Sequence, residues 1–237
     1  MQQSILNSKQ NDVSFVNLSF YLDATDLRSY PGAGTTWTDK SGNGRHFTFS
    51  GSPTFTSGTP SYFTTTGPGA TGPASNSLGI NNTSGYSIYL ICMQNALVAT
   101  GAFQFYRTGT APAHRAIFAH CTWSDDVVYF DQGGCCGTDT RTSVASGGSQ
   151  TWNIWTFTRE TNGNTRKIYK NGSLLATNTN AAATIDLNST GVQVGSVTDY
   201  SGTWNARLGG FLAYNIGQTD AEVLSNANFL KSRYGIA

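Results

Sequence analysis

The stretch that decides the fold class begins with Trp155-Thr-Phe-Thr-Arg159, continues through Asn162-Gly163 to Thr165-Arg-Lys-Ile-Tyr-Lys170, and ends with Asn171-Gly172 and Ser173-Leu-Leu-Ala-Thr177. The first run alternates apolar and polar side chains, which is the period of a β-strand. An Asn-Gly pair between two such runs indicates a β-hairpin, because both central residues of a type I′ turn need positive φ. Two such pairs in series predict a three-stranded antiparallel meander. In this meander Trp155 and Phe157 face the core, and Thr156 and Thr158 face the other way.

Working outward, the rest of the chain carries more strand signals and one helix signal. A capping box between Thr219 and Glu222, followed by an apolar stripe at helical spacing, predicts one short C-terminal helix that Gly235 can close. Segments rich in Pro and Gly at residues 30–45 and 67–79 predict long loops. Further strands are predicted at residues 18–22, 85–93, 103–106, 117–123, 127–131, 192–194 and 208–214.

The composition narrows the fold class and the possible partners. Only 11% of the 237 residues are charged, the net charge is +1, and Thr, Gly, Ser and Asn are abundant. Strands and turns favour these residue types, so the composition predicts an all-β chain. A chain this neutral lacks the basic surface of a nucleic-acid-binding protein. No stretch of the sequence reaches about 18 consecutive apolar residues, so no membrane-spanning helix is predicted. We expect a polar arm at residues 1–13 and one domain at residues 14–237.

The short strands, the hairpins and the late helix predict a two-sheet antiparallel jelly-roll sandwich. Four segments carry a closer resemblance, at residues 22–44, 119–137, 155–175 and 209–235. Through them the chain resembles the laminin-G-like, concanavalin A-like jelly-roll domains of virion, phage-fibre and bacterial surface proteins. The resemblance implies the fold more than the function, because such domains bind sugars, bind proteins or only pack in an assembly.

Glycan binding is one function that the residues allow. An aromatic ring would meet the apolar side of a pyranose, and polar side chains would hold its hydroxyl groups. Around one predicted hairpin the candidates are His120, Trp123, Asp125 and Asp126, and Trp204 is a further candidate in a loop near the edge of the sandwich. The alternative is that Trp123 packs under its own hairpin and the two aspartates only stabilise the turn.

A calcium ion is the one cofactor that we consider. Asp39 and Asn43 lie in the run Asp-Lys-Ser-Gly-Asn-Gly at residues 39–44, and lectin-like jelly rolls often hold calcium with Asp and Asn oxygens from such loops. The alternative is a turn in which Asp39 and Asn43 cap local backbone amides.

The four cysteines are expected to be free thiols, largely buried. The alternatives are a metal at the adjacent pair Cys135 and Cys136, or a disulfide from Cys121 to one member of that pair. Cys92 has no assigned partner.

We expect no enzymatic activity. Retaining glycan hydrolysis needs two carboxyl groups about 5–5.5 Å apart, whereas the two glutamates, Glu160 and Glu222, are expected at a hairpin turn and in a helix. The resemblance makes a virion structural protein the first expectation: a capsid decoration, minor capsid or fibre-associated subunit that recognises host surface glycans. Its partners would be other capsid or fibre subunits in an oligomer or larger assembly.

The first fifteen residues carry no secretory signal, which fits a subunit assembled in the host cytoplasm and located in the virion. The alternatives are a secreted or cell-surface carbohydrate-binding adhesin module, which would be extracellular, and a divergent glycanase.

Overall fold

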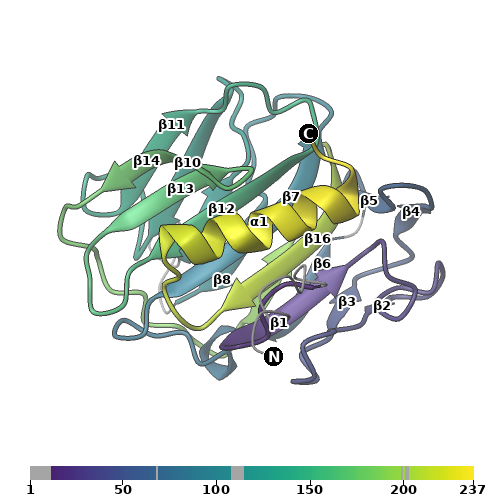
Figure 1. Ribbon diagram of the computed structural model, residues 1–237, viewed down its shortest axis with the longest axis horizontal. Coiled ribbons are helices and arrows are strands. Elements are labelled where there is room, and N and C mark those ends of the chain that lie inside the picture. Colours follow the sequence, from purple (N-terminus) through teal and green to yellow (C-terminus); the bar gives the residue numbers. More distant parts are fainter. Residues whose placement is uncertain (1–11, 68, 108–114, 199, 201–202) are drawn as a thin grey trace, which may run out of the picture.

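Two antiparallel β-sheets stack face to face, and one helix crosses the outer face of one sheet (Figure 1). The computed structural model of the protein describes residues 12–67, 69–107, 115–198, 200 and 203–237. Each sheet has eight strands. The chain therefore folds as the two-sheet antiparallel sandwich with a short C-terminal helix that the sequence predicts.

Sheet A is the sheet that the helix covers. Its strand order is β14-β13-β12-β7-β16-β5-β4, and β1 also pairs with β16. The bounds are β1 (Leu18–Asp23), β4 (Thr54–Thr56), β5 (Tyr62–Thr64), β7 (Tyr86–Gln94), β12 (Asn153–Arg159), β13 (Arg166–Lys170), β14 (Ser173–Asn178) and β16 (Ala206–Tyr214).

Sheet B lies on the other side of the sandwich. Its strand order is β11-β10-β9-β8-β15-β6-β3-β2. The bounds are β2 (Thr36–Trp37), β3 (Phe47–Phe49), β6 (Ala70–Ala74), β8 (Phe103–Tyr106), β9 (Arg115–His120), β10 (Val127–Gln132), β11 (Arg141–Ala145) and β15 (Gly191–Val194). A single turn of 3-10 helix, η1 (Ser75–Ser77), follows β6.

The predicted meander is confirmed as β12, β13 and β14. Asn162 and Asn171 have φ of 54° and 53°, as the two Asn-Gly turns require. Trp155 and Phe157 lie in the core between the sheets. Thr158 is buried as well, on the opposite face, because α1 (Asp220–Tyr234) runs over that face of sheet A (Figure 1).

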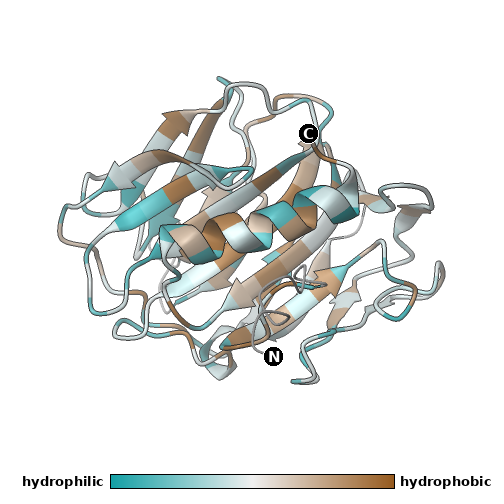
Figure 2. Ribbon diagram, viewed as in Figure 1, coloured by the Kyte–Doolittle hydropathy of each residue, from teal (hydrophilic) through white to brown (hydrophobic). Residues whose placement is uncertain are grey.

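The helix buries a second, smaller apolar cluster against the outer face of sheet A. Its N-terminus has the predicted capping box of Thr219 and Glu222, and Gly235 ends it at φ 63°. Figure 2 shows hydrophobic and hydrophilic residues alternating along the helix, as expected for a helix that lies on a sheet. The buried residues of this cluster are Val13, Leu18, Tyr21, Tyr89, Ile91, Ile154, Leu212, Tyr214, Leu230 and Tyr234.

The N-terminal end of the described chain touches this cluster. Val13 is buried in it, and the Ser14 backbone N–H donates to Asn226 of the helix at 3.0 Å. Residues 1–11 of the expected arm lie outside the described residues, so an arm that ends at residue 13 stays a prediction.

Two segments that the sequence predicts as loops contain short strands. β2 lies within residues 30–45, and β6 lies within residues 67–79. β6 has a Gly-Pro step inside it, and a Cβ atom at Gly72 would lie 2.4 Å from the ring of Phe47 on the neighbouring strand. Only glycine fits at position 72, because the Phe47 side chain approaches its backbone so closely. Glycine and proline are rare inside strands, so the sequence pattern of this segment does not predict a strand.

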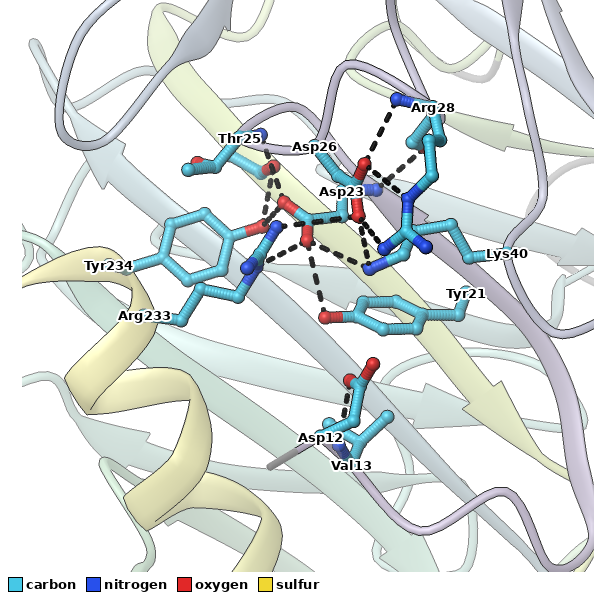
Figure 3. A network of polar contacts seen from close by, with 12 residues as sticks. Asp12, Val13, Tyr21, Asp23, Thr25, Asp26, Arg28, Lys40, Arg233 and Tyr234 are labelled. Atoms are coloured by element: carbon cyan, nitrogen blue, oxygen red, sulfur yellow. Dashed lines mark hydrogen bonds and ion pairs between the residues drawn. The ribbon is translucent and has the colours of Figure 1, made fainter. Parts of the chain in front are cut away.

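The C-terminal end of the helix is tied to β1 by a buried carboxylate, Asp23 (Figure 3). Tyr234 donates its hydroxyl to Asp23 Oδ1 at 2.8 Å, and the Arg233 and Lys40 side chains form ion pairs with Oδ2. Asp26 lies next to this group and pairs with Lys40 at 2.9 Å and with the exposed Arg28 at 2.7 Å. The network joins three segments that are distant in sequence.

Among the described residues, no helix combines the length and the hydropathy that crossing a membrane would need.

Candidate functional site

The outer face of sheet B carries a cluster of aromatic and charged side chains. Ile117 and Ala119 of β9 and Phe130 of β10 point into the core, so the residues between them point outward. The outward residues of the two strands include Phe118, His120, Tyr129 and Asp131. No helix covers this face in the part of the chain that the structure describes.

A pocket of about 230 Å³ opens on this face. The rings of Trp123 and His120 meet in a T-shaped contact with their centroids 4.6 Å apart, and the centre of the Tyr200 ring lies 5.6 Å from that of Trp123. Three aromatic rings form part of the pocket wall, those of Trp123, Tyr129 and Tyr200, and all three are half-buried. The lining residues are Arg115, His120, Trp123, Tyr129, Cys135, Cys136, Arg141 and Tyr200.

Asp131 holds the two arginines of the pocket in place. Its side chain is fully buried, and Arg141 donates to it from both Nε and Nη2, the latter at 2.7 Å. Arg115 donates from Nη1 at 3.2 Å and, from Nη2, to the Tyr200 hydroxyl at 2.7 Å. The two hydrogen bonds from Arg141 to Asp131 fix the plane of the Arg141 guanidinium, because the two N–H donors match the two carboxylate oxygens.

Aromatic rings also hold the two guanidinium groups in position. The Arg141 guanidinium carbon lies 4.5 Å from the centre of the Tyr129 ring, and that of Arg115 lies 4.3 Å from the centre of the Phe118 ring. Such stacking suits a planar delocalised cation. Each guanidinium group is thus held by the Asp131 carboxylate and by the face of an aromatic ring.

His120 is a neutral histidine at the back of the pocket. Burial lowers its pKa to about 4, so it is uncharged at neutral pH. Its Nδ1 lies 2.8 Å from the carbonyl oxygen of Thr100, and because a carbonyl can only accept, Nδ1 carries the proton. The other ring nitrogen, Nε2, is then an acceptor, and it lies 4.0 Å from Asp131 Oδ2.

Cys135 and Cys136 form a disulfide with each other at the rim of the pocket. The expectation of free thiols is therefore wrong for this pair, and the alternative bond from Cys121 is not formed. Cys92 and Cys121 are free and buried, as expected. The Cys136 backbone has φ of 80°, and Arg141 Nη2 lies 3.5 Å from Cys135 Sγ, so the bonded pair packs beside the Arg141 guanidinium.

The structure brings together some of the predicted glycan-binding residues. Trp123 and His120 both line the pocket. Asp125 is exposed at its border and accepts a hydrogen bond from the Tyr129 hydroxyl at 2.8 Å. Its side chain therefore fixes an aromatic ring of the pocket wall.

Two of the predicted residues lie elsewhere. Asp126 Oδ1 accepts hydrogen bonds from the Ser146 and Ser149 hydroxyls, both at 2.7 Å, and these bonds stabilise the turn, as the alternative interpretation had it. Trp204 is fully buried within the core between the sheets, so the expectation of an accessible aromatic ring is wrong there.

Sequence reasoning missed Arg115, Arg141 and the disulfide as parts of the site. One signal was present: Asp131 and Arg141 flank a glycine-rich turn, and they pair directly across β10 and β11. Tyr200 comes from a loop that follows β15, and its contact with His120 and Trp123 depends on the fold.

The candidate calcium residues form a hydrogen-bonded turn. Asp39 is buried, and its carboxylate accepts from the backbone N–H groups of Tyr21, Ser41 and Arg45 at 2.8 to 3.0 Å. Asn43 donates its amide to the carbonyl oxygens of Leu18 and Ser19. Asp39 therefore has the capping role given above as the alternative, whereas Asn43 caps no amide and instead bonds two carbonyl groups of β1. The described residues contain no group of three or more His, Cys, Asp or Glu side chains arranged to hold a metal ion.

Comparisons with known proteins bear on the fold. No protein-family model and no curated protein matches this chain. Among solved structures, it is similar to a mutant of Trypanosoma rangeli sialidase displaying trans-sialidase activity, with a TM-score of 0.66 and 12% identity over 93% of this chain. This chain spans only 34% of that sialidase.

Two further domains are similar to the same degree. The binding domain of Paraclostridial Mosquitocidal Protein 1 has a TM-score of 0.65 and 15% identity, over 90% of this chain and 52% of that one. Domain 4 of AbnA, a GH43 extracellular arabinanase from Geobacillus stearothermophilus, was solved in complex with arabinotriose. Its TM-score is 0.66 and its identity 17%, over 89% of this chain and 98% of that domain. At these identities the similarity shows a shared β-sandwich fold.

Proposed function

We propose that this domain is a non-catalytic carbohydrate-binding module whose ligand occupies the pocket on the outer face of sheet B. The observation that carries the proposal is the composition of the pocket wall. Trp123, Tyr129 and Tyr200 supply aromatic surface for the apolar side of a sugar ring. Arg141, whose side chain is 22% exposed and held by Asp131, supplies a fixed polar group for its hydroxyls.

The comparisons support a sugar as the ligand. Domain 4 of AbnA matches this chain over nearly its whole length and was solved with arabinotriose. The sialidase is named for its action on a sugar. Because the identities are low, these similarities support the ligand class by analogy of fold only.

The lining of the pocket supports a binding role over hydrolysis. Most retaining and inverting glycosidases place two carboxyl groups on either side of the bond that they cleave, and sialidases, which use a tyrosine nucleophile, are an exception. Among the described residues that line the pocket there is no carboxylate. Asp131 lies beneath them, and both of its oxygens accept hydrogen bonds from arginine. A divergent glycanase stays an alternative, which release of sugar from a bound glycan would reveal.

The virion role proposed from the resemblance is a narrower hypothesis. A capsid or fibre subunit and a cell-surface adhesin would both use a sugar-binding pocket of this kind. Recovery of the chain from purified particles, with its copy number, would support the first hypothesis.

The test of the binding proposal is a glycan array with a matched pair of tryptophan variants. We expect Trp123→Ala to weaken binding at least about tenfold, because central aromatic contacts carry most of the binding energy in such sites. Trp152→Ala is the control: Trp152 is also half-buried but packs near Tyr62 on sheet A. It should bind as the wild type does.

Three results would contradict the proposal. The wild type could bind no glycan on a broad array, Trp123→Ala could bind with unchanged affinity, or both variants could lose binding equally. The melting temperature of each variant is measured in parallel, so that loss of fold is separated from loss of a contact.

A further inference from the structure

A second hollow lies beside the pocket, at the edge of the sandwich. It is a groove of about 350 Å³ between β11 and β14, which each end the strand order of their sheet and lie side by side there (Figure 1). Its lining comes from Arg141, Thr142 and Ser143 on one side and from residues 176–180 on the other. Arg141 also lines the pocket, so the two hollows meet at this side chain.

The sizes of the two hollows favour a single site that includes both. Ligand sites in proteins usually enclose about 300–1,000 Å³. The pocket alone, at about 230 Å³, lies below this range, and the groove of about 350 Å³ brings the joint site into it. A ligand longer than one sugar unit would therefore extend from the pocket into the groove.

The groove presents both donors and acceptors of hydrogen bonds. Among its described lining residues only Arg141 is charged, and the others carry hydroxyl, amide or methyl groups. Because β11 and β14 are edge strands, part of their backbone N–H and C=O groups also has no partner in a neighbouring strand. A hydroxyl group both donates and accepts hydrogen bonds, so the hydroxyls of a saccharide chain match such a mixed surface.

The side chain of Asn178 disfavours a peptide in this groove. An extended peptide would bind a strand edge as one more strand, through backbone hydrogen bonds. Asn178 of β14 donates its amide to the backbone carbonyl oxygens of Arg141 at 2.9 Å and of Thr138 at 3.0 Å. It thus bridges the two walls and already uses a carbonyl group on the edge of β11. A saccharide chain can lie over this bridge, because it does not need the carbonyl.

Arg141 is suited to hold a chain where the pocket meets the groove. Its Nε and Nη2 groups bond Asp131, which fixes the side chain before a ligand binds. Its Nη1 group makes no hydrogen bond within the described part of the chain, so it can donate to a sugar oxygen. A donor that is already ordered loses little side-chain entropy when it binds.

From these features we infer that the ligand is a saccharide chain of at least two units, and that the groove between β11 and β14 is a second subsite. One unit contacts the rings of Trp123 and Tyr200 in the pocket, and the chain then passes Arg141 into the groove. The inference rests on the proposed function and adds the length of the ligand and its path.

The test is the dependence of affinity on chain length, measured by isothermal titration calorimetry. The probes are linear arabino-, xylo-, galacto- and N-acetylglucosamine oligosaccharides, each from the single sugar to the hexamer. In a series that binds, we expect the affinity to rise about tenfold or more from the single sugar to the hexamer. Equal affinity at every length would overturn the inference and leave the proposed function standing. Absence of binding to these probes and to every sugar on the array would overturn the proposed function itself.

A variant that fills the groove separates the two subsites. Asn180 is exposed and lines the groove but not the pocket. We expect Asn180→Trp to reduce the gain from chain length to about twofold or less, while binding of the single sugar stays unchanged. The matched control is Asn76→Trp, since Asn76 is also exposed but lies in η1 and lines neither hollow. It should keep the full gain, and the melting temperatures show that both variants are folded.

Amide NMR spectra of the wild type follow the path of the chain directly. The hexamer should shift the backbone signals of Ser143, Thr177 and Asn180, whereas the single sugar should shift only those of residues around the pocket. A chain that avoids the groove would leave these three signals in place, and its gain from length would persist in folded Asn180→Trp. Either result would overturn the inference.

Discussion

At the scale of single residues, His120 makes the stability of the protein depend on pH. Its imidazole is buried among Phe118, Trp123 and Tyr200, and burial lowers its pKa to about 4 from an ordinary value near 6.5. Between these two pH values the unfolded chain binds a proton that the folded chain does not, so stability falls as the pH falls. Above about pH 6.5 the residue contributes no pH dependence.

We therefore expect the free energy of unfolding to decrease between about pH 6.5 and pH 4, by roughly 3 kcal/mol from this residue alone. Urea denaturation of the wild type and of His120→Gln at about pH 7, 5.5 and 4.5 measures the difference. The other histidines and all carboxylates are retained in the variant, so their titration cancels. Parallel pH curves for the two proteins would show that His120 is not the group responsible.

Residue types in the sequence predicted part of this site. Trp123 and His120 were predicted because they lie close together in sequence around one hairpin, and contacts within a hairpin can be predicted from the local sequence. Trp204 was misplaced because nothing in a loop sequence says which way an aromatic ring turns, and this one is fully buried. Arg115 was missed because its contact with Asp131 depends on how β9 and β10 pair.

At the scale of elements, the last turn of α1 is tied to sheet A. The capping box orders its first turn, and the buried Asp23 carboxylate binds Arg233 and Tyr234 at its last turn (Figure 3). Breaking a buried ion pair by removing one partner is costly, because the remaining charges lose their compensation.

Asp23→Ala should accordingly destabilise the protein by about 3 kcal/mol or more. Arg28→Ala is the control, because its pair with Asp26 involves an arginine side chain that is 81% exposed, and it should leave stability within error of the wild type. Chemical denaturation followed by tryptophan fluorescence compares them. Equal effects of the two substitutions would mean that the Asp23 network does not anchor the helix.

Elements with strong local signals were the ones that the sequence could place. The two Asn-Gly turns and the capping box each need particular residues at fixed spacing, so β12, β13, β14 and α1 could be predicted. β2 and β6 have weak local preference, and they exist because neighbouring strands provide hydrogen-bonding partners. Strands of this kind depend on tertiary context.

At the scale of the whole molecule, Phe211 joins the two sheets. Its ring on β16 lies 5.1 Å from Phe20 of β1, and across the sandwich 6.0 Å from Phe47 of β3 and 5.4 Å from Phe103 of β8. These centroid distances are those of packed aromatic pairs.

Phe211→Ala should cost about 3–5 kcal/mol, because it leaves a cavity between the sheets. Leu224→Ala removes an apolar side chain from the helix that is 47% exposed, and its effect should be within about 1 kcal/mol. Thermal unfolding by calorimetry measures both. A small effect at Phe211 would indicate that the sheets are held together elsewhere in the core.

The fold class was accessible from composition and strand count, whereas the strand order was not. Pairing β16 with β7, β1 and β5 brings together segments from the two ends of the chain, and no local pattern encodes such contacts. Registers of this kind arise from the packing of the whole core.

The position of β16 in sheet A has a consequence for how the protein is made. A ribosome delivers β1, β5 and β7 more than 100 residues before Ala206–Tyr214, yet β16 is the strand with which all three pair. Until it emerges, the nascent chain presents unpaired strand edges and uncovered aromatic side chains, the features that promote aggregation of unfinished β proteins. Productive folding therefore has to wait until β16 has left the ribosome, and during that interval chaperones that shield strand edges would raise the yield.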